Sequence, residues 1–137
     1  HKMIERTTTL FAVHSLKYMK AGGRIGGAAA FLGGLIHIKP VCEFVEGVVR
    51  PIKAVRGRKN SLQTMADVAI SRAGDFGKMI LVIQNARFPE DAGYLIDCLR
   101  KKTGFTGKIY KSDLGITVGA HSGPGAIGIG FVADPLV

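Results

Sequence analysis

The chain has 137 residues, 47% hydrophobic and 21% charged, which indicates one globular domain with a hydrophobic core and excludes an intrinsically disordered chain. The formal net charge of +9 favours an anionic partner: nucleic acid, a membrane surface or an acidic ligand. The richest apolar run, residues 25–38, is shorter than the ~20 residues of a membrane span and predicts a buried helix instead. Cys42 and Cys98 lie far apart and predict free thiols in a reducing cytoplasm.

The first half of the chain predicts a strand, two helices and a hairpin. Residues 7–16 are rich in β-branched and aromatic side chains and predict a strand. A short helix follows and ends at Gly22, and residues 24–38 predict a second helix whose glycines require support from tertiary packing. Residues 39–57 predict a hairpin that turns at Glu46–Gly47.

The second half alternates helices and strands. Asn60 is predicted to cap a helix that extends to residue 74, and residues 78–84 predict a strand that is buried on both faces. Residues 89–104 carry the clearest helix pattern, with proline and acidic residues at the start and basic residues and glycine at the end.

Residues 107–115 and 126–134 predict the final strands. We therefore expect residues 1–137 to form a single domain of the α+β class, in which a mixed sheet of about five or six strands packs with about four helices.

The segment GAHSGPGAIGIGF, residues 119–131, surrounds His121 with glycines. Gly119, Gly123 and Gly125 would let the backbone approach another group closely, and successive free N–H groups in such a loop can bind an anion. His121 could donate a hydrogen bond to the same anion. The alternative is a tight turn between strands in which the histidine only fills space.

Arg24, in the segment KAGGRIGG, stands at a predicted helix start. Helix N-termini favour anions, and a guanidinium can hold a carboxylate or phosphate with two parallel hydrogen bonds. The alternative is a solvated arginine at a corner between two helices. The order of the glycines does not match the G-x-G-x-x-G dinucleotide-binding pattern.

A basic run, Arg50, Lys53, Arg56, Arg58 and Lys59, follows the hairpin turn. Such a run is usually a solvated sheet edge, although a nucleic-acid-binding surface is a second interpretation. Candidates for catalysis are few, because no acid near His121 would orient it toward a nucleophile and no ligand spacing indicates a metal. We therefore predict no catalytic residue, no metal and no cofactor.

Three segments in order, LKYMKAGGRIGGAAAFLGGLIHIKPV, KAVRGRKNSLQTM and GAHSGPGAIGIGF, resemble the C-terminal domain of the DegV family of bacterial fatty-acid-binding proteins. In that family a GGRI segment opens a small-residue helix before an IKP-type strand. A VRG segment follows a hairpin, and an H-x-GPGxxG turn lies near the end. The resemblance extends over nearly the whole chain, from about Thr7.

The resemblance implies a two-domain, non-enzymatic, cytoplasmic protein that buries one long-chain fatty acid between its domains. It implies that the carboxylate is presented to a partner fatty acid kinase for phosphorylation. The N-terminal α/β domain of the family is missing from this chain, so we expect the isolated domain to bind fatty acid weakly or not at all and to expose an apolar face. Stable membrane insertion and nucleic-acid binding are not expected under this interpretation.

The resemblance also implies the site residues. His121 matches the family histidine that hydrogen-bonds the carboxylate, and Ser122 and Gly123 adjoin it at the same end of the ligand. Arg24 and Arg56 match basic positions near the carboxylate or on the kinase-docking surface. The apolar helix is expected to line the acyl tunnel with Ile25, Ala29, Phe31, Leu32, Leu35 and Ile36.

The sequence is also compatible with two other functions. One is a basic nucleic-acid-binding domain that uses the run from Arg50 to Lys59. The other is a small-molecule enzyme or phosphate- or carboxylate-binding domain that uses Arg24 and His121.

Overall fold

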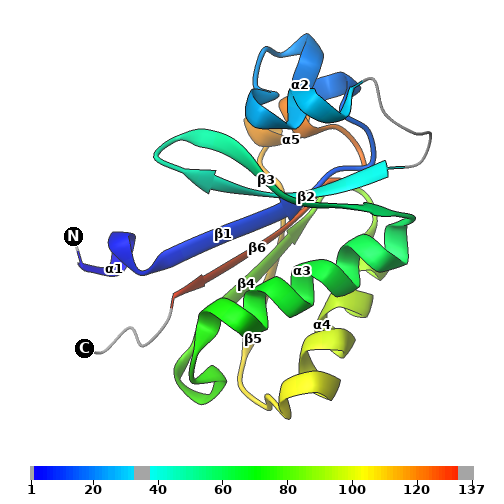
Figure 1. The fold of residues 1–137 in the computed structure, drawn as a ribbon. Coiled ribbons are helices and arrows are strands. Elements are labelled where there is room, and N and C mark those ends of the chain that lie inside the picture. Colours follow the sequence, from blue (N-terminus) through cyan, green and yellow to red (C-terminus); the bar gives the residue numbers. More distant parts are fainter. Residues whose placement is uncertain (1, 33–37, 133–137) are drawn as a thin grey trace.

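The computed structural model describes residues 2–32 and 38–132, which form a six-stranded mixed sheet in the order β3-β2-β1-β6-β4-β5 (Figure 1). The elements are α1 (Lys2–Glu5), β1 (Thr7–Ala12), α2 (Lys17–Ala21), the 3₁₀ helix η1 (Gly26–Phe31), β2 (Ile38–Val45), β3 (Val48–Arg56), α3 (Arg58–Ala73), the 3₁₀ helix η2 (Phe76–Lys78), β4 (Ile80–Asn85), α4 (Pro89–Thr103), β5 (Ile109–Asp113), α5 (Ile116–Ser122) and β6 (Ile127–Val132). The α+β class and the number of strands are confirmed. The described part of the chain has five α-helices, close to the predicted four.

The strand pairing is antiparallel except at one edge. β1 pairs with both β2 and β6, and β6 pairs with β4, all antiparallel. β4 and β5 are parallel and are connected through α4. The β2–β3 hairpin turns at Glu46 and Gly47, whose φ angles of 51° and 78° are both left-handed, as a two-residue type I′ turn requires. The predicted hairpin is therefore confirmed.

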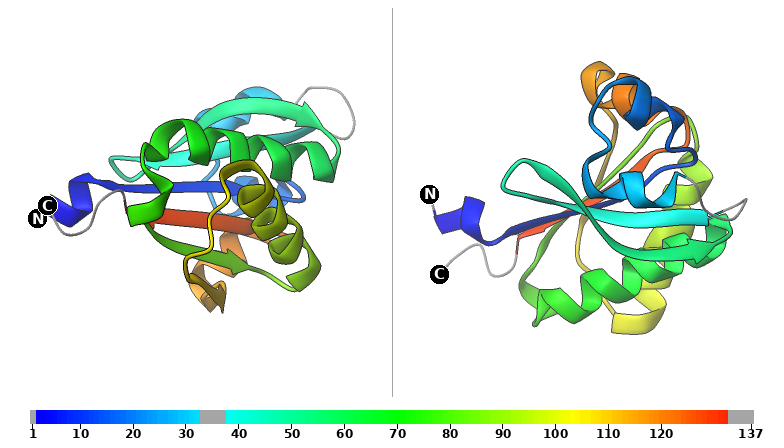
Figure 2. Two further views of the ribbon diagram at one scale, coloured as in Figure 1. Left: turned by 90° about the horizontal axis from the view of Figure 1, so that it is seen from below. Right: turned by 45° about the horizontal axis from the view of Figure 1, so that its top comes forward.

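One face of the sheet is covered by two long helices. Helices α3 and α4 lie side by side on this face, with α2 and α5 on the opposite side of the sheet (Figure 2). The sheet side chains that pack under α3 and α4 are almost completely buried and include Leu10, Val41, Leu81, Ile83, Ile127, Ile129 and Phe131. This face holds the main hydrophobic core.

The opposite face is covered only at one end. There, α2, η1 and α5 shelter a smaller cluster formed by Phe11, Val13, Met19, Ala28, Cys42, Val49 and Ala126. Both cysteines are free, and burial raises the pKa of the Cys42 thiol to about 12, so Cys42 acts as a small apolar side chain. The uncovered part of this face is where the candidate site lies.

β4 departs from the predicted burial. Leu81 and Ile83 are fully buried, but Ile80 is 39% exposed and Val82 only half-buried. The expectation of a strand buried on both faces was wrong because helices cover only the Leu81–Ile83 side. Within the described residues, no helix is long and apolar enough to cross a membrane.

Two helix predictions also need correction. Of the long helix predicted over residues 24–38, the described part is only the 3₁₀ helix η1, and residues 33–37 lie outside the described residues. Gly26 is left-handed at φ 51°, and an added Cβ would lie 2.7 Å from the Val49 carbonyl oxygen, so this segment packs against β3 more closely than a regular helix with side chains could. Asn60 lies inside α3 and donates to the Arg56 carbonyl, while Gly57 is the N-cap.

Candidate ligand-binding site

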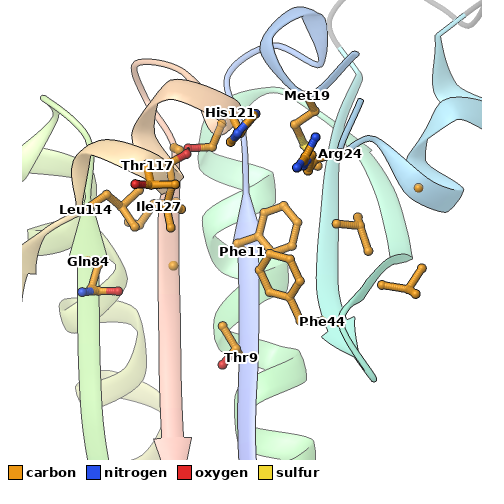
Figure 3. Close-up of a pocket in the computed structure, with 18 of the residues that line it drawn as sticks. Thr9, Phe11, Met19, Arg24, Phe44, Gln84, Leu114, Thr117, His121 and Ile127 are labelled. Atoms are coloured by element: carbon orange, nitrogen blue, oxygen red, sulfur yellow. The ribbon is translucent and has the colours of Figure 1, made fainter. Parts of the chain in front are cut away.

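A cavity of about 490 Å³ opens on the partly covered sheet face, between α5 and the β2–β3 hairpin (Figure 3). Its lining is mostly apolar, with a few polar groups: Thr9, Phe11, Met19, Gly23, Arg24, Gly26, Phe44, Gly47, Val48, Val49, Gln84, Leu114, Thr117, Val118, His121, Ser122, Ala126, Ile127 and Gly128. Its volume lies within the range of small-molecule sites.

The apolar wall is built on strands. Phe11 of β1 and Phe44 of β2 stack with their ring centroids 4.8 Å apart, and both rings border the cavity. Phe44, Val48 and Val118 are each about half exposed, at 49%, 52% and 50%. Large apolar side chains left uncovered around a cavity indicate a surface that is covered by an apolar ligand or partner.

The basic groups gather at one end. His121 and Arg24 both line the cavity, and Figure 3 shows them at the same end, beyond the Phe11–Phe44 pair, with Thr9 at the other end. Arg24 bends back so that its Nη1 donates to the Gly22 carbonyl at 2.9 Å. The arrangement suits a molecule with an anionic head and an apolar body.

His121 does not lie in a glycine loop. It occupies the last turn of α5, and the expectation of an anion-binding loop or a tight turn that contains the histidine was wrong. Gly119 is helical, and the left-handed glycines are Gly123 and Gly125, at φ 78° and 80°, which reverse the chain after the helix. The imidazole is thus held by a helix that packs against α2.

The two neighbours of His121 have different environments. Ser122 lines the cavity and is buried, and its Oγ donates to the Val118 carbonyl at 2.7 Å. Gly123 borders a second, more open depression and lies against the Tyr18 ring, where an added Cβ would come within 2.2 Å of Cδ2. Gly123 therefore has a packing role at the junction of α2 and α5.

Several predicted positions lie away from the cavity. Arg56 is exposed at the end of β3, in register with Ile38, and is not among the lining residues. Of the predicted tunnel residues, Ile25 and Phe31 pack on the cluster beneath the cavity, and Ala29 and Leu32 are exposed; none of these four borders it. Leu35 and Ile36 lie outside the described residues.

The sequence did contain a signal for the apolar wall. In β1 the apolar side chains continue through Leu10, Phe11 and Ala12, so both faces of the strand are apolar, although only Leu10 and Ala12 lie in the main core. In the hairpin, the paired residues Phe44 and Val49 are likewise apolar side chains on the sheet face that carries the cavity. Among the residues that the structure describes, no three His, Cys, Asp or Glu side chains are placed to hold a metal ion.

Arg58 supports the segment that follows His121. Its Nε donates to Asp91 Oδ2 at 2.8 Å, and its Nη2 donates to the Gly125 carbonyl at 2.6 Å. The sequence favours a solvated sheet edge for the basic run that contains Arg58, but the Arg58 side chain is only 16% exposed. It joins the starts of α3 and α4 to the turn after α5.

A basic cluster around His14 predicts a pH effect on stability. Partial burial, Lys39 and Arg58 lower the pKa of His14, and Asp91 opposes them more weakly. The folded pKa lies below the unfolded value of 6.5, so the unfolded chain takes up the proton first and stability falls as pH drops through that window. We expect His14→Gln to reduce this loss when urea unfolding is compared at pH 7.5 and 5.5; an unchanged difference would contradict the assignment.

The sheet, the two long helices on one face and the largely apolar cavity on the other face define an α+β domain with a candidate ligand-binding site. The chain belongs to the DegV family: the family model, described as "Uncharacterised protein, DegV family", matches residues 1–134.

Curated relatives and solved structures agree with this membership. The chain is 31% identical to a DegV domain-containing protein of Streptomyces coelicolor over 90% of its own length and 43% of the relative's. It is 33% identical to a DegV domain-containing protein of Staphylococcus aureus, over 95% of its own length and 45% of the relative's. The chain therefore spans about half the length of the curated relatives it matches.

Among solved structures, the fatty acid binding DegV family protein from Streptococcus agalactiae superposes with a TM-score of 0.86 at 28% identity, covering 96% of this chain and 46% of that one. DegV from Bacillus subtilis, described as a fatty acid binding protein, gives 0.77 at 29% identity with the same coverages.

Proposed function

We propose that this chain binds a long-chain fatty acid, with the carboxylate at the His121–Arg24 end of the cavity and the acyl chain along Phe11 and Phe44. The observation that carries the proposal is that two basic side chains, His121 of α5 and Arg24 of the segment after α2, lie at the same end of an apolar cavity. A carboxylate that leaves water needs charged or N–H partners, whereas a hydrocarbon chain needs only apolar walls.

The binding role extends to a larger assembly. An N-terminal α/β domain completes the site by covering the open sheet face, and the carboxylate is presented to a partner fatty acid kinase in the bacterial cytoplasm. Supporting this, solved relatives about twice as long are described as fatty acid binding, and the rim residues Phe44, Val48 and Val118 are left exposed in this chain. The chain acts as a non-catalytic binding component.

The test compares palmitic acid with hexadecanol, using the product of the complete gene and, separately, the 137-residue chain. Arg24→Ala and His121→Ala should each weaken binding of the acid about tenfold, equivalent to ~1.4 kcal/mol, and change binding of the alcohol much less. The shorter chain should bind the acid more weakly than the complete product.

Arg100→Ala is the matched control, because Arg100 is exposed on α4, on the far side of the sheet from the cavity. If Arg100→Ala weakens acid binding as much as the cavity substitutions do, the effect comes from the lower net charge and not from the cavity. Acid binding that survives both cavity substitutions would contradict the proposed carboxylate site.

A further inference from the structure

Gly22 does not need to be glycine for its backbone conformation. It closes α2 with φ −83° and ψ −2°, in the right-handed region that every L-residue adopts, and its N–H donates to the Tyr18 carbonyl at 2.9 Å. The next residue differs, since Gly23 is left-handed at φ 67°. The absence of a side chain at Gly22 therefore requires another explanation.

The imidazole of His121 occupies the space that a side chain at Gly22 would need. A Cβ there would lie 2.1 Å from His121 Nδ1 and 2.9 Å from Cε1, both closer than non-bonded atoms can approach. A reciprocal contact lies beside it, where the Tyr18 ring of α2 packs on Gly123 after α5. Each helix thus presents a bare glycine to a ring from the other, which fixes their relative position.

Gly22 also holds the second basic group of the cavity. Its carbonyl accepts the hydrogen bond from Arg24 Nη1 at 2.9 Å. One residue therefore contacts the imidazole through its Cα side and the guanidinium through its carbonyl. Figure 3 shows these two side chains at the same end of the cavity.

We propose that Gly22 is the positioning residue that sets His121 and Arg24 relative to each other, so that both face a single carboxylate. This inference rests on the proposed fatty-acid function. A side chain at position 22 would displace the imidazole from its seat and shift the carbonyl that restrains the guanidinium. The cavity would keep its apolar wall and lose the preorganised end that distinguishes an acid from a neutral ligand.

The test is Gly22→Ala in the product of the complete gene, measured with palmitic acid and hexadecanol. Affinity for the acid should fall about tenfold or more, and affinity for the alcohol should stay within about twofold. The acid-to-alcohol ratio should therefore approach that of His121→Ala. A role confined to packing would weaken both ligands together and leave the ratio unchanged.

Gly93→Ala is the control, because a Cβ at Gly93 in α4 meets nothing within 4 Å, and it should keep the wild-type ratio. If wild type prefers the acid and Gly22→Ala keeps that preference, the inference about Gly22 is overturned alone. If wild type binds acid and alcohol equally, the proposed function is overturned together with this role of Gly22.

Thermal unfolding tests the contact without any ligand. Gly22→Ala should lower the melting temperature by several degrees in the wild-type background and by much less in His121→Ala, where the imidazole is gone. Equal losses in both backgrounds would overturn the inference. If Gly22→Ala does not fold in the wild-type background, the double variant Gly22→Ala/His121→Ala should fold. A double variant that also fails to fold would overturn the inference.

Discussion

Replacing Phe131 by alanine is expected to lower the free energy of unfolding by about 3–5 kcal/mol, the range for deleting a buried phenyl ring. Phe131 lies on β6, is 2% exposed, and packs in the core between the sheet and the α3–α4 layer. β6 pairs with both β1 and β4, so the cavity left behind would lie near the centre of the sheet. Urea unfolding followed by circular dichroism measures the loss.

Phe44→Ala makes the same chemical change on the other face and serves as its control. Phe44 is 49% exposed and stacks on Phe11, so we expect a loss of less than about 1 kcal/mol in stability. Its effect should instead appear in ligand binding, because the ring borders the cavity. Similar stability losses in the two variants would contradict the division of the sheet into a face that holds the main core and a face that carries the cavity.

The elements that could be predicted from the sequence are those with local signals. α4 begins with Pro89, has Glu90 and Asp91 in its first turn and ends at Gly104, which is left-handed at φ 71°. The hairpin turn at Glu46–Gly47 is equally local. In these segments the residues that define each boundary lie within a few positions of it, so no tertiary information was needed.

α5 shows why other elements could not be predicted. Glycines at 115, 119 and 123 read locally as a loop, yet Ile116–Ser122 is helical. Packing supports it: Tyr18 and Gly22 from a distant segment contact its C-terminal end. Such contacts follow from the tertiary fold and outweigh weak local propensity.

The candidate site, too, was predicted only in part. The family resemblance placed Arg24 and His121 together, and both line one cavity, while their role as carboxylate ligands remains a prediction. The apolar wall was assigned to the helix predicted over residues 24–38, whereas the structure lines the cavity with strand residues such as Phe11 and Phe44. Which strand face remains uncovered depends on the sheet order, and that order is set by long-range pairing.

Arg58→Met should lower the free energy of unfolding by about 2–4 kcal/mol, because it leaves the partly buried hydrogen-bond acceptors of the guanidinium without a donor. Methionine retains an unbranched apolar side chain but cannot donate to the Asp91 carboxylate, which is 17% exposed, or to the Gly125 carbonyl. Chemical unfolding at neutral pH measures this loss. The turn after α5 should loosen as well, so backbone amide hydrogen exchange should accelerate between residues 122 and 126.

Lys102→Met is the comparison, since Lys102 pairs with Asp67 where both side chains are about half exposed, at 43% and 58%. Solvent screens such a pair, so its removal should lower the free energy of unfolding much less than Arg58→Met does. Comparing the two variants therefore distinguishes a solvated ion pair from one that joins α3, α4 and the turn after α5. If Arg58→Met costs no more than Lys102→Met, or costs as much in an Asp91→Asn background as in wild type, then Arg58 does not support the turn after α5 through Asp91.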